Sequence, residues 1–176
     1  MPPACAGDHA KSKWGYLTGD VGHEYMSRNP RIGELSAKRS LLKDAGQFHE
    51  AIPLQLEIIE LLQEEDPDPD RLANAHNMAS VLYLRAKLYS SAEWHGRQAL
   101  ALKADGDSAK DHEALGAFNL VMARILASRS EIEAATDFGQ SAISEYSHWH
   151  TPADDFLLSI IDEVQSIKDS TWTTPE

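Results

Sequence analysis

The chain has 176 residues, which is enough for one domain with a substantial core and too few for two domains of ordinary size. Sixteen basic residues stand against 28 acidic ones, and the formal net charge is -12. Because so acidic a surface repels the phosphate backbone that supplies most nucleic-acid affinity, we do not expect DNA or RNA as partners.

The first element is an N-terminal arm over residues 1–33 that is basic and rich in glycine. Residues 1–43 carry seven basic and four acidic residues, so the acidic excess lies in the rest of the chain. Four apolar side chains of the arm have helical spacing: Trp14, Leu17, Val21 and Tyr25. We expect a short helix packed on the body that follows, or an arm that folds back into a binding groove.

The single cysteine, Cys5, excludes an intrachain disulfide and fits a reducing compartment. The first residues lack the basic and apolar regions of a secretory signal, and no apolar run approaches the roughly 18 residues of a membrane span. We therefore expect a cytoplasmic protein with no membrane partner.

A repeat of about 42 residues follows over residues 34–150, and each of its three units reads as a helix, a short turn and a second helix. Two sets of aligned positions are Phe48, Tyr89 and Ile132, and Ala51, Ala92 and Ala135. No segment shows sustained alternation with period two, so we predict an all-α fold.

Helix-start signals separate the repeat units. The two prolines between Asp66 and Asp70 stop one helix, and Asp70 is positioned to cap the next; the polar stretch that ends at Ser108 does the same before the third unit. Capping boxes are predicted at the starts of two second helices: Ser90 with Glu93, and Ser130 with Glu133.

Small residues at helical spacing, Ala92, Gly96 and Ala99, predict a face on which the paired helix of the same unit approaches closely. After the third unit, residues 151–168 predict a capping helix with Thr151 as its N-cap and Asp154 closing a capping box. Its apolar stripe consists of Phe156, Leu157, Ile160, Ile161, Val164 and Ile167. A frayed tail is expected over residues 169–176.

The turns carry a small residue, an aromatic three positions later and an alanine three further on, with glycine or alanine after four and seven more residues. This pattern resembles that of tetratricopeptide repeats, and "LANAHNMASVLY" with "SAEWHGRQALALK" is similar to the kinesin-light-chain branch. The resemblance covers residues 34–146, and in the third unit Arg124 and Ser128 depart from it. It implies a solenoid of about three helix pairs whose concave groove binds a peptide or partner protein.

The resemblance also implies the groove residues, which are Ser36, Arg39, Asn74, Asn77, Val81, Leu84, Asn119 and Arg124. Asparagine offers a donor and an acceptor together, which suits clamping an extended peptide backbone. Alternatively, Asn77 and Asn119 bond neighbouring backbone and stabilise the stack.

Eight histidines keep an enzymatic or metal-binding interpretation open. We expect His76 to pack inside its helix pair, and His49, His95 and His112 to be exposed. If a small molecule binds, the catalytic candidates are His23, His76, His148 and His150. His148 and His150 are also the metal candidates, but two ligands are too few for a closed zinc site unless a distant residue contributes. No cofactor or metal is therefore expected.

Three functions remain open from the sequence. The leading hypothesis is an adaptor whose groove binds a peptide or protein. The alternative is a small-molecule-binding protein or enzyme on the same scaffold, with Trp14, Tyr16 and the histidines closing a pocket. A homo-oligomeric assembly module is the third.

Overall fold

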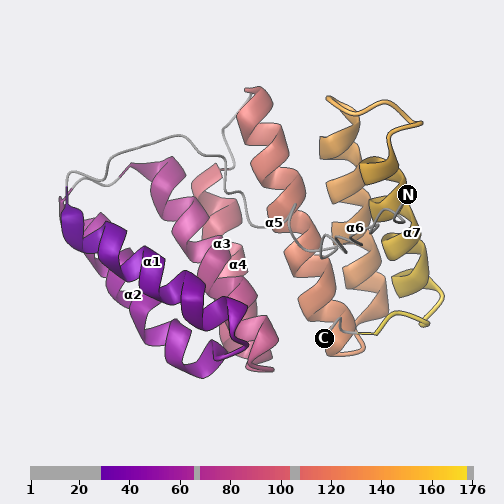
Figure 1. Ribbon diagram of the computed structural model, residues 1–176. Helices are drawn as coiled ribbons and strands as arrows, with labels where there is room; N and C mark the ends of the chain where they lie inside the picture. Colours follow the sequence, from indigo (N-terminus) through magenta and orange to yellow (C-terminus); the bar gives the residue numbers. More distant parts are fainter. Residues whose placement is uncertain (1–28, 66–67, 104–107, 174–176) are drawn as a thin grey trace, which may run out of the picture.

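The computed structural model describes residues 29–65, 68–103 and 108–173, and these residues form seven helices and no strand. The prediction of an all-α fold is confirmed. The helices are α1 (Pro30–Asp44), α2 (Phe48–Glu65), α3 (Pro69–Arg85), α4 (Tyr89–Lys103), α5 (Ala109–Ser128), α6 (Ile132–Ser147) and α7 (Asp155–Lys168). Figure 1 shows them following one another across the molecule, with α1 and α2 at one side and α6 and α7 at the other. Each helix packs against the next along the chain, and α3 also contacts α5.

None of the described helices is both long and apolar enough to cross a membrane.

One turn geometry joins α1 to α2, α3 to α4 and α5 to α6. Its central residue has a positive φ, of 73° at Gly46, 60° at Lys87 and 64° at Ser130. The next amide donates to a carbonyl five residues back: Gln47 to Leu42, Leu88 to Tyr83, and Glu131 to Leu126, over 2.8 to 2.9 Å. This is the Schellman ending of a helix. The same ending closes α7, where Ser170 has a φ of 58° and Thr171 donates to Ser166 over 2.9 Å.

These turns explain why the two capping boxes predicted at Ser90 and Ser130 are wrong. Ser130 occupies the left-handed position of the turn, whereas an N-cap residue needs extended backbone. Glu131 precedes α6 and makes no side-chain capping bond. Ser90 lies inside α4, which already begins at Tyr89.

Short polar residues cap four of the helices. Asn29 caps α1, whose start at Pro30 places residues 30–33 of the predicted arm in the helical body. Asp68, rather than Asp70, caps α3. Ser108 caps α5 in a reciprocal box with Asp111.

The start of α7 corrects a further prediction, because the N-cap residue of this helix is Asp154 rather than Thr151. The Asp154 carboxylate accepts from the amide of Phe156 over 2.9 Å, so the helix begins at Asp155 and leaves Thr151 and Pro152 in the preceding loop.

The small residues of the second helices lie against neighbouring helices, and Gly96 meets α5 more closely than the paired helix α3 that the sequence predicted. A Cβ atom added to Gly96 in α4 would lie 2.5 Å from Met122 Sδ of α5 and 3.2 Å from Ser80 Oγ of α3. At Gly139 in α6, an added Cβ would lie 2.7 Å from a methyl group of Val164 in α7. The second helix of a unit therefore lies close to the next helix along the chain, α4 to α5 and α6 to α7.

Residues 169–173 of the predicted frayed tail are held by contacts with the rest of the protein, and residues 174–176 lie outside the described residues. Four residues of the predicted stripe on α7 are buried, whereas Ile161 is 37% exposed and Phe156 is half-buried. Beyond α7, Trp172 packs against a core cluster that contains Ile167, and its indole Nε1 donates to Glu163 Oε1 over 3.2 Å. The buried residues of the stripe are Leu157, Ile160, Val164 and Ile167.

Candidate functional site

The expected groove residues of α3 lie on one face of that helix, since Asn74, Asn77 and Val81 are three and four positions apart. Asn74 is exposed, and Asn77 and Val81 are half-buried. The side-chain oxygen of Asn77 is buried and has no hydrogen-bond partner among the described residues. This oxygen therefore does not make the hydrogen bond to neighbouring backbone that the alternative interpretation requires. Ser36 on α1 is also half-buried.

A hydrogen-bond relay holds Arg39 of the expected groove in place. Its guanidinium Nη1 donates to Gln55 Oε1 over 2.6 Å, and the Gln55 amide donates to the carbonyl oxygen of Ala75 over 2.8 Å. Gln55 is 1% exposed, so this relay connects α1, α2 and α3 through the interior. Arg39 is thereby part of the packing between these helices.

Three other expected groove residues are buried, namely Leu84, Asn119 and Arg124. Arg124 extends from α5 to α7, where its Nε and Nη2 donate to the two oxygens of Glu163 over 2.6 Å each. This bidentate pair is the strongest geometry available to a guanidinium and a carboxylate. All three side chains are thus largely covered by the protein, and Arg124 is held by Glu163.

His76 and His95 form a buried pair between α3 and α4. Burial of His76 confirms the prediction, whereas the prediction of an exposed His95 is wrong because that ring is 6% exposed. The ring of Tyr83 stacks on His95 at 5.3 Å, and Trp94 meets it edge-on at 4.7 Å. Burial lowers the pKa of both imidazoles, and that of His95 falls to about 4.

The repeat register shows what this pair replaces. The positions aligned with His76 and His95 carry leucines in the first unit and phenylalanines in the third. The second unit therefore carries a polar pair at two positions where the other units carry apolar residues. The aligned residues are Leu35 with Leu54, and Phe118 with Phe138.

A buried lysine joins the ends of three helices at one edge of the molecule. Lys103 Nζ donates to Asp70 Oδ1 over 2.8 Å and also to Asp111, and Lys103 is 4% exposed. The two carboxylates raise the pKa of Lys103 against the effect of its burial. Hydrogen bonds from Lys103 and Ser108 hold the pKa of Asp111 well below its usual range. This network joins α3, α4 and α5, and the pKa shifts keep Lys103 and Asp111 charged at neutral pH.

The start of α5 and the end of α6 bring together a histidine cluster, which consists of His112, Glu145 and His148. The His112 imidazole donates from Nδ1 to Glu145 Oε2 over 2.6 Å, and the His112 and His148 rings stack with centroids 4.4 Å apart at 25°. Each of the three residues offers one ligand atom, and these atoms lie within 4.8 Å of one another. His112 is half-buried, which corrects its prediction as an exposed residue.

His150, the other metal candidate, does not join this cluster. Its Nδ1 donates to Asp154 Oδ2 over 3.1 Å, and this hydrogen bond lowers the pKa of Asp154. The N-cap of α7 therefore uses the histidine that the sequence left unexplained. His23, a further catalytic candidate, lies outside the described residues.

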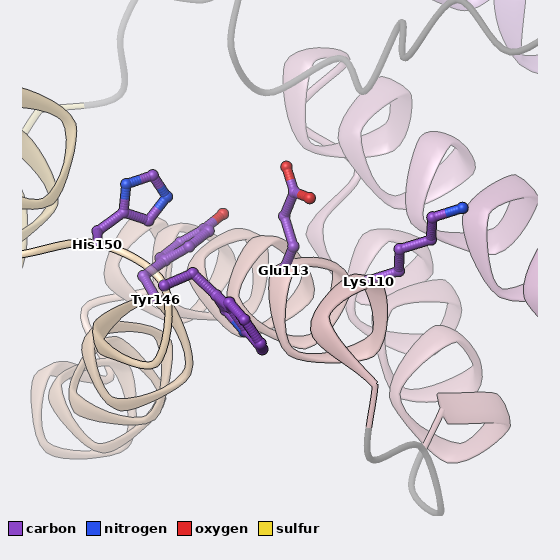
Figure 2. A pocket seen from close by; sticks show the side chains of 5 residues that line it. Lys110, Glu113, Tyr146 and His150 are labelled. Atoms are coloured by element: carbon purple, nitrogen blue, oxygen red, sulfur yellow. The ribbon is translucent and has the colours of Figure 1, made fainter.

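A pocket of about 320 Å³ opens beside the histidine cluster. Figure 2 shows Lys110 and Glu113 projecting from α5 and His150 on the far side of the pocket, with Tyr146 between Glu113 and His150. Burial raises the pKa of Tyr146 well above its usual range, so its hydroxyl remains protonated. Five residues line the pocket: Lys110, Glu113, Tyr146, Trp149 and His150.

The sequence pointed to His148 as a candidate ligand. It indicated no role for Glu145, and for His112 it predicted only an exposed position. A usable signal existed, because His112 and His148 lie at equal distances along the chain from Ser130 in the turn. In two antiparallel helices joined by a short turn, residues equidistant from the turn come side by side.

No protein-family model matches the chain, and a search of curated proteins finds no significant match. The likeness to tetratricopeptide repeats therefore remains a prediction from the residues.

Proposed function

We propose that this protein is a tetratricopeptide-like array of about three helix pairs, similar to kinesin-light-chain repeats, that binds an extended segment of a partner protein. The threefold use of one turn supports the array. The second helices after those turns begin at Phe48, Tyr89 and Ile132, the positions aligned in the repeat. The alanine three residues into each of them is fully buried, namely Ala51, Ala92 and Ala135.

The observation that carries the binding function is the polar row on α3. Asn74 is exposed beside Asn77. The side-chain amide oxygen of Asn77, Oδ1, is buried and has no hydrogen-bond partner among the described residues. Buried polar atoms normally have a partner, so this oxygen is available to a donor that a ligand brings after a small rotation of the side chain. Backbone amides of an extended peptide are donors of that kind.

The charge of the protein favours a basic segment as the ligand. The net charge of -12 attracts cationic peptides and accelerates their encounter, most strongly at low ionic strength. The expected partner segment is therefore extended and rich in lysine or arginine, with few acidic residues.

Selection from a displayed random peptide library tests this function. Selected peptides should lose affinity about tenfold when Asn74 and Asn77 are both changed to alanine, since each lost hydrogen bond contributes about 0.5–1.5 kcal/mol. Gln140→Ala on the exposed side of α6 is the matched control and should bind as the parent does. If no basic peptides are selected, or if they bind the double variant equally well, the proposal fails.

The pocket beside Tyr146 favours a second candidate function, the binding of a small molecule. Its volume of about 320 Å³ is at the lower end of the range for ligand sites, and it combines aromatic walls with Lys110 and Glu113. Trp149 is 57% exposed, so a bound molecule should change its fluorescence. A fragment screen with Trp149→Phe as control tests this function, and hits that bind the variant unchanged would exclude the pocket.

A further inference from the structure

We propose that His112, Glu145 and His148 bind one divalent transition-metal ion of the zinc class. The three side chains come from the first turn of α5, the last turn of α6 and the C-cap residue that follows α6. Their ligand atoms already lie within 4.8 Å of one another, so side-chain rotations alone can close the set around one ion. The proposal is independent of the peptide-binding function and concerns a different part of the molecule.

The chemistry of the three ligands selects the ion. Two imidazoles and one carboxylate form the set that holds zinc where a fourth position stays open, at metal–ligand distances of about 2.0–2.2 Å. Calcium and magnesium prefer an all-oxygen shell, which this set does not offer. The site is therefore expected to take zinc, cobalt or nickel in preference to either of those ions.

The surroundings of the cluster also favour a cation. His148 lies at the C-terminal end of α6, where unpaired carbonyls carry the negative end of the helix dipole. His112 and Glu145 are half-buried while His148 is exposed, so the ion reaches the site from solvent. In the metal-bound state the ion takes the place of the hydrogen bond between His112 Nδ1 and Glu145, and the imidazole proton moves from Nδ1 to Nε2 by exchange with solvent, so that the ring stays neutral.

A purely structural role accounts for only part of this arrangement. The hydrogen bond between His112 and Glu145 would by itself connect α5 to α6. It does not require His148, whose ring stacks on His112 while the residue remains exposed. The two interpretations therefore differ in what removal of His148 does: a structural pair is unaffected, whereas a metal site loses a ligand.

Titration of the tag-free full-length protein with zinc chloride, and separately with cobalt chloride, tests the proposal. We expect one equivalent of zinc to bind, a visible absorption band from cobalt, and a rise in the melting temperature with zinc. His148→Ala and Glu145→Gln should each lower zinc affinity at least about tenfold, by analogy with the effect of even outer-shell changes at metal sites.

His150→Ala is the matched control, because this neighbouring histidine pairs with Asp154 and should leave zinc affinity unchanged. Circular dichroism establishes that each variant is folded, and the exposure of His148 makes its replacement the least disruptive. Absence of saturable zinc binding to the parent protein would overturn the proposal. So would a His148→Ala protein that binds zinc as tightly as the parent, or an equal loss in His150→Ala.

Discussion

The imidazoles of His76 and His95 meet inside the molecule with their Nδ1 atoms 2.9 Å apart. One nitrogen must donate and the other accept, so at least the accepting ring is neutral in the folded protein. Burial lowers the pKa of both imidazoles, which favours the neutral form of each ring.

Stability should therefore fall as the pH drops. His95 has a folded pKa of about 4 against an ordinary value of 6.5, so the unfolded chain binds a proton in this interval and the folded one does not. The free energy of unfolding should be highest above about pH 6.5 and decrease toward pH 4, by up to about 3 kcal/mol for this group. Urea unfolding at pH 7 and pH 5 measures the change.

The double variant His76→Leu with His95→Leu supplies the control, because leucines occupy the aligned positions of the first unit, Leu35 and Leu54. Its stability should depend less on pH than that of the parent. An unchanged slope in the double variant would show that other groups cause the pH dependence.

The pair of Arg124 and Glu163 should stabilise the contact between α5 and α7. Replacing Glu163 by glutamine leaves a buried guanidinium without its carboxylate, which should lower the free energy of unfolding by about 1–3 kcal/mol. Asp162→Asn, on the exposed side of the same helix, should change it by less than about 0.5 kcal/mol. Chemical denaturation compares the two variants, and equal losses in both would contradict the assignment.

Two glycines in helices should respond in opposite directions to replacement by alanine. Gly139→Ala forces a methyl group against Val164, which is 1% exposed, and should destabilise the protein by about 1–3 kcal/mol. Gly33→Ala on α1 meets nothing within 4 Å and should stabilise it by about 0.5–1 kcal/mol. Melting temperatures of the two variants test the packing between α6 and α7, and a neutral Gly139→Ala would refute that close approach.

The left-handed position of the three helix-joining turns can be tested by exchanging glycine with other residues. Gly46→Ala should destabilise the protein by about 1 kcal/mol, since a residue with a side chain is strained at a φ of 73°. Lys87→Gly and Ser130→Gly place glycine at the same position of the other two turns and should be neutral or stabilising. Denaturation midpoints decide the matter, and a Gly46→Ala protein as stable as the parent would argue against the strain.

The helical content and the close-packed small faces could be predicted because they depend on local pattern. Gly96 and its alanine neighbours mark a near approach whichever helix supplies the partner, and that partner is α5 together with α3. The N-caps were harder to place. The sequence suggests an N-cap at Ser130, two residues before α6. Ser130 instead occupies the left-handed position of the turn, and its positive φ excludes the extended backbone that an N-cap residue needs.

Burial of polar side chains was the least predictable feature. His95 was expected at the surface of its helix. Its neighbours Trp94 and Arg97 are exposed in the structure, but the His95 ring faces His76 of α3 and is buried. Arg124 likewise read as a departure from the repeat pattern. Its partner Glu163 lies in a helix whose position depends on packing beyond the repeat.

The Glu163 carboxylate accepts from Arg124 of α5 and also from the indole of Trp172 beyond α7. The Glu163 side chain therefore connects α5, α7 and the segment after α7. Helix ends commonly open one residue at a time, but here Trp172 cannot leave without weakening the contact that holds α7 against α5. The amides of α7 should therefore exchange their hydrogens with solvent as one cooperative group, at a rate that reports the release of α7 together with the segment that holds Trp172.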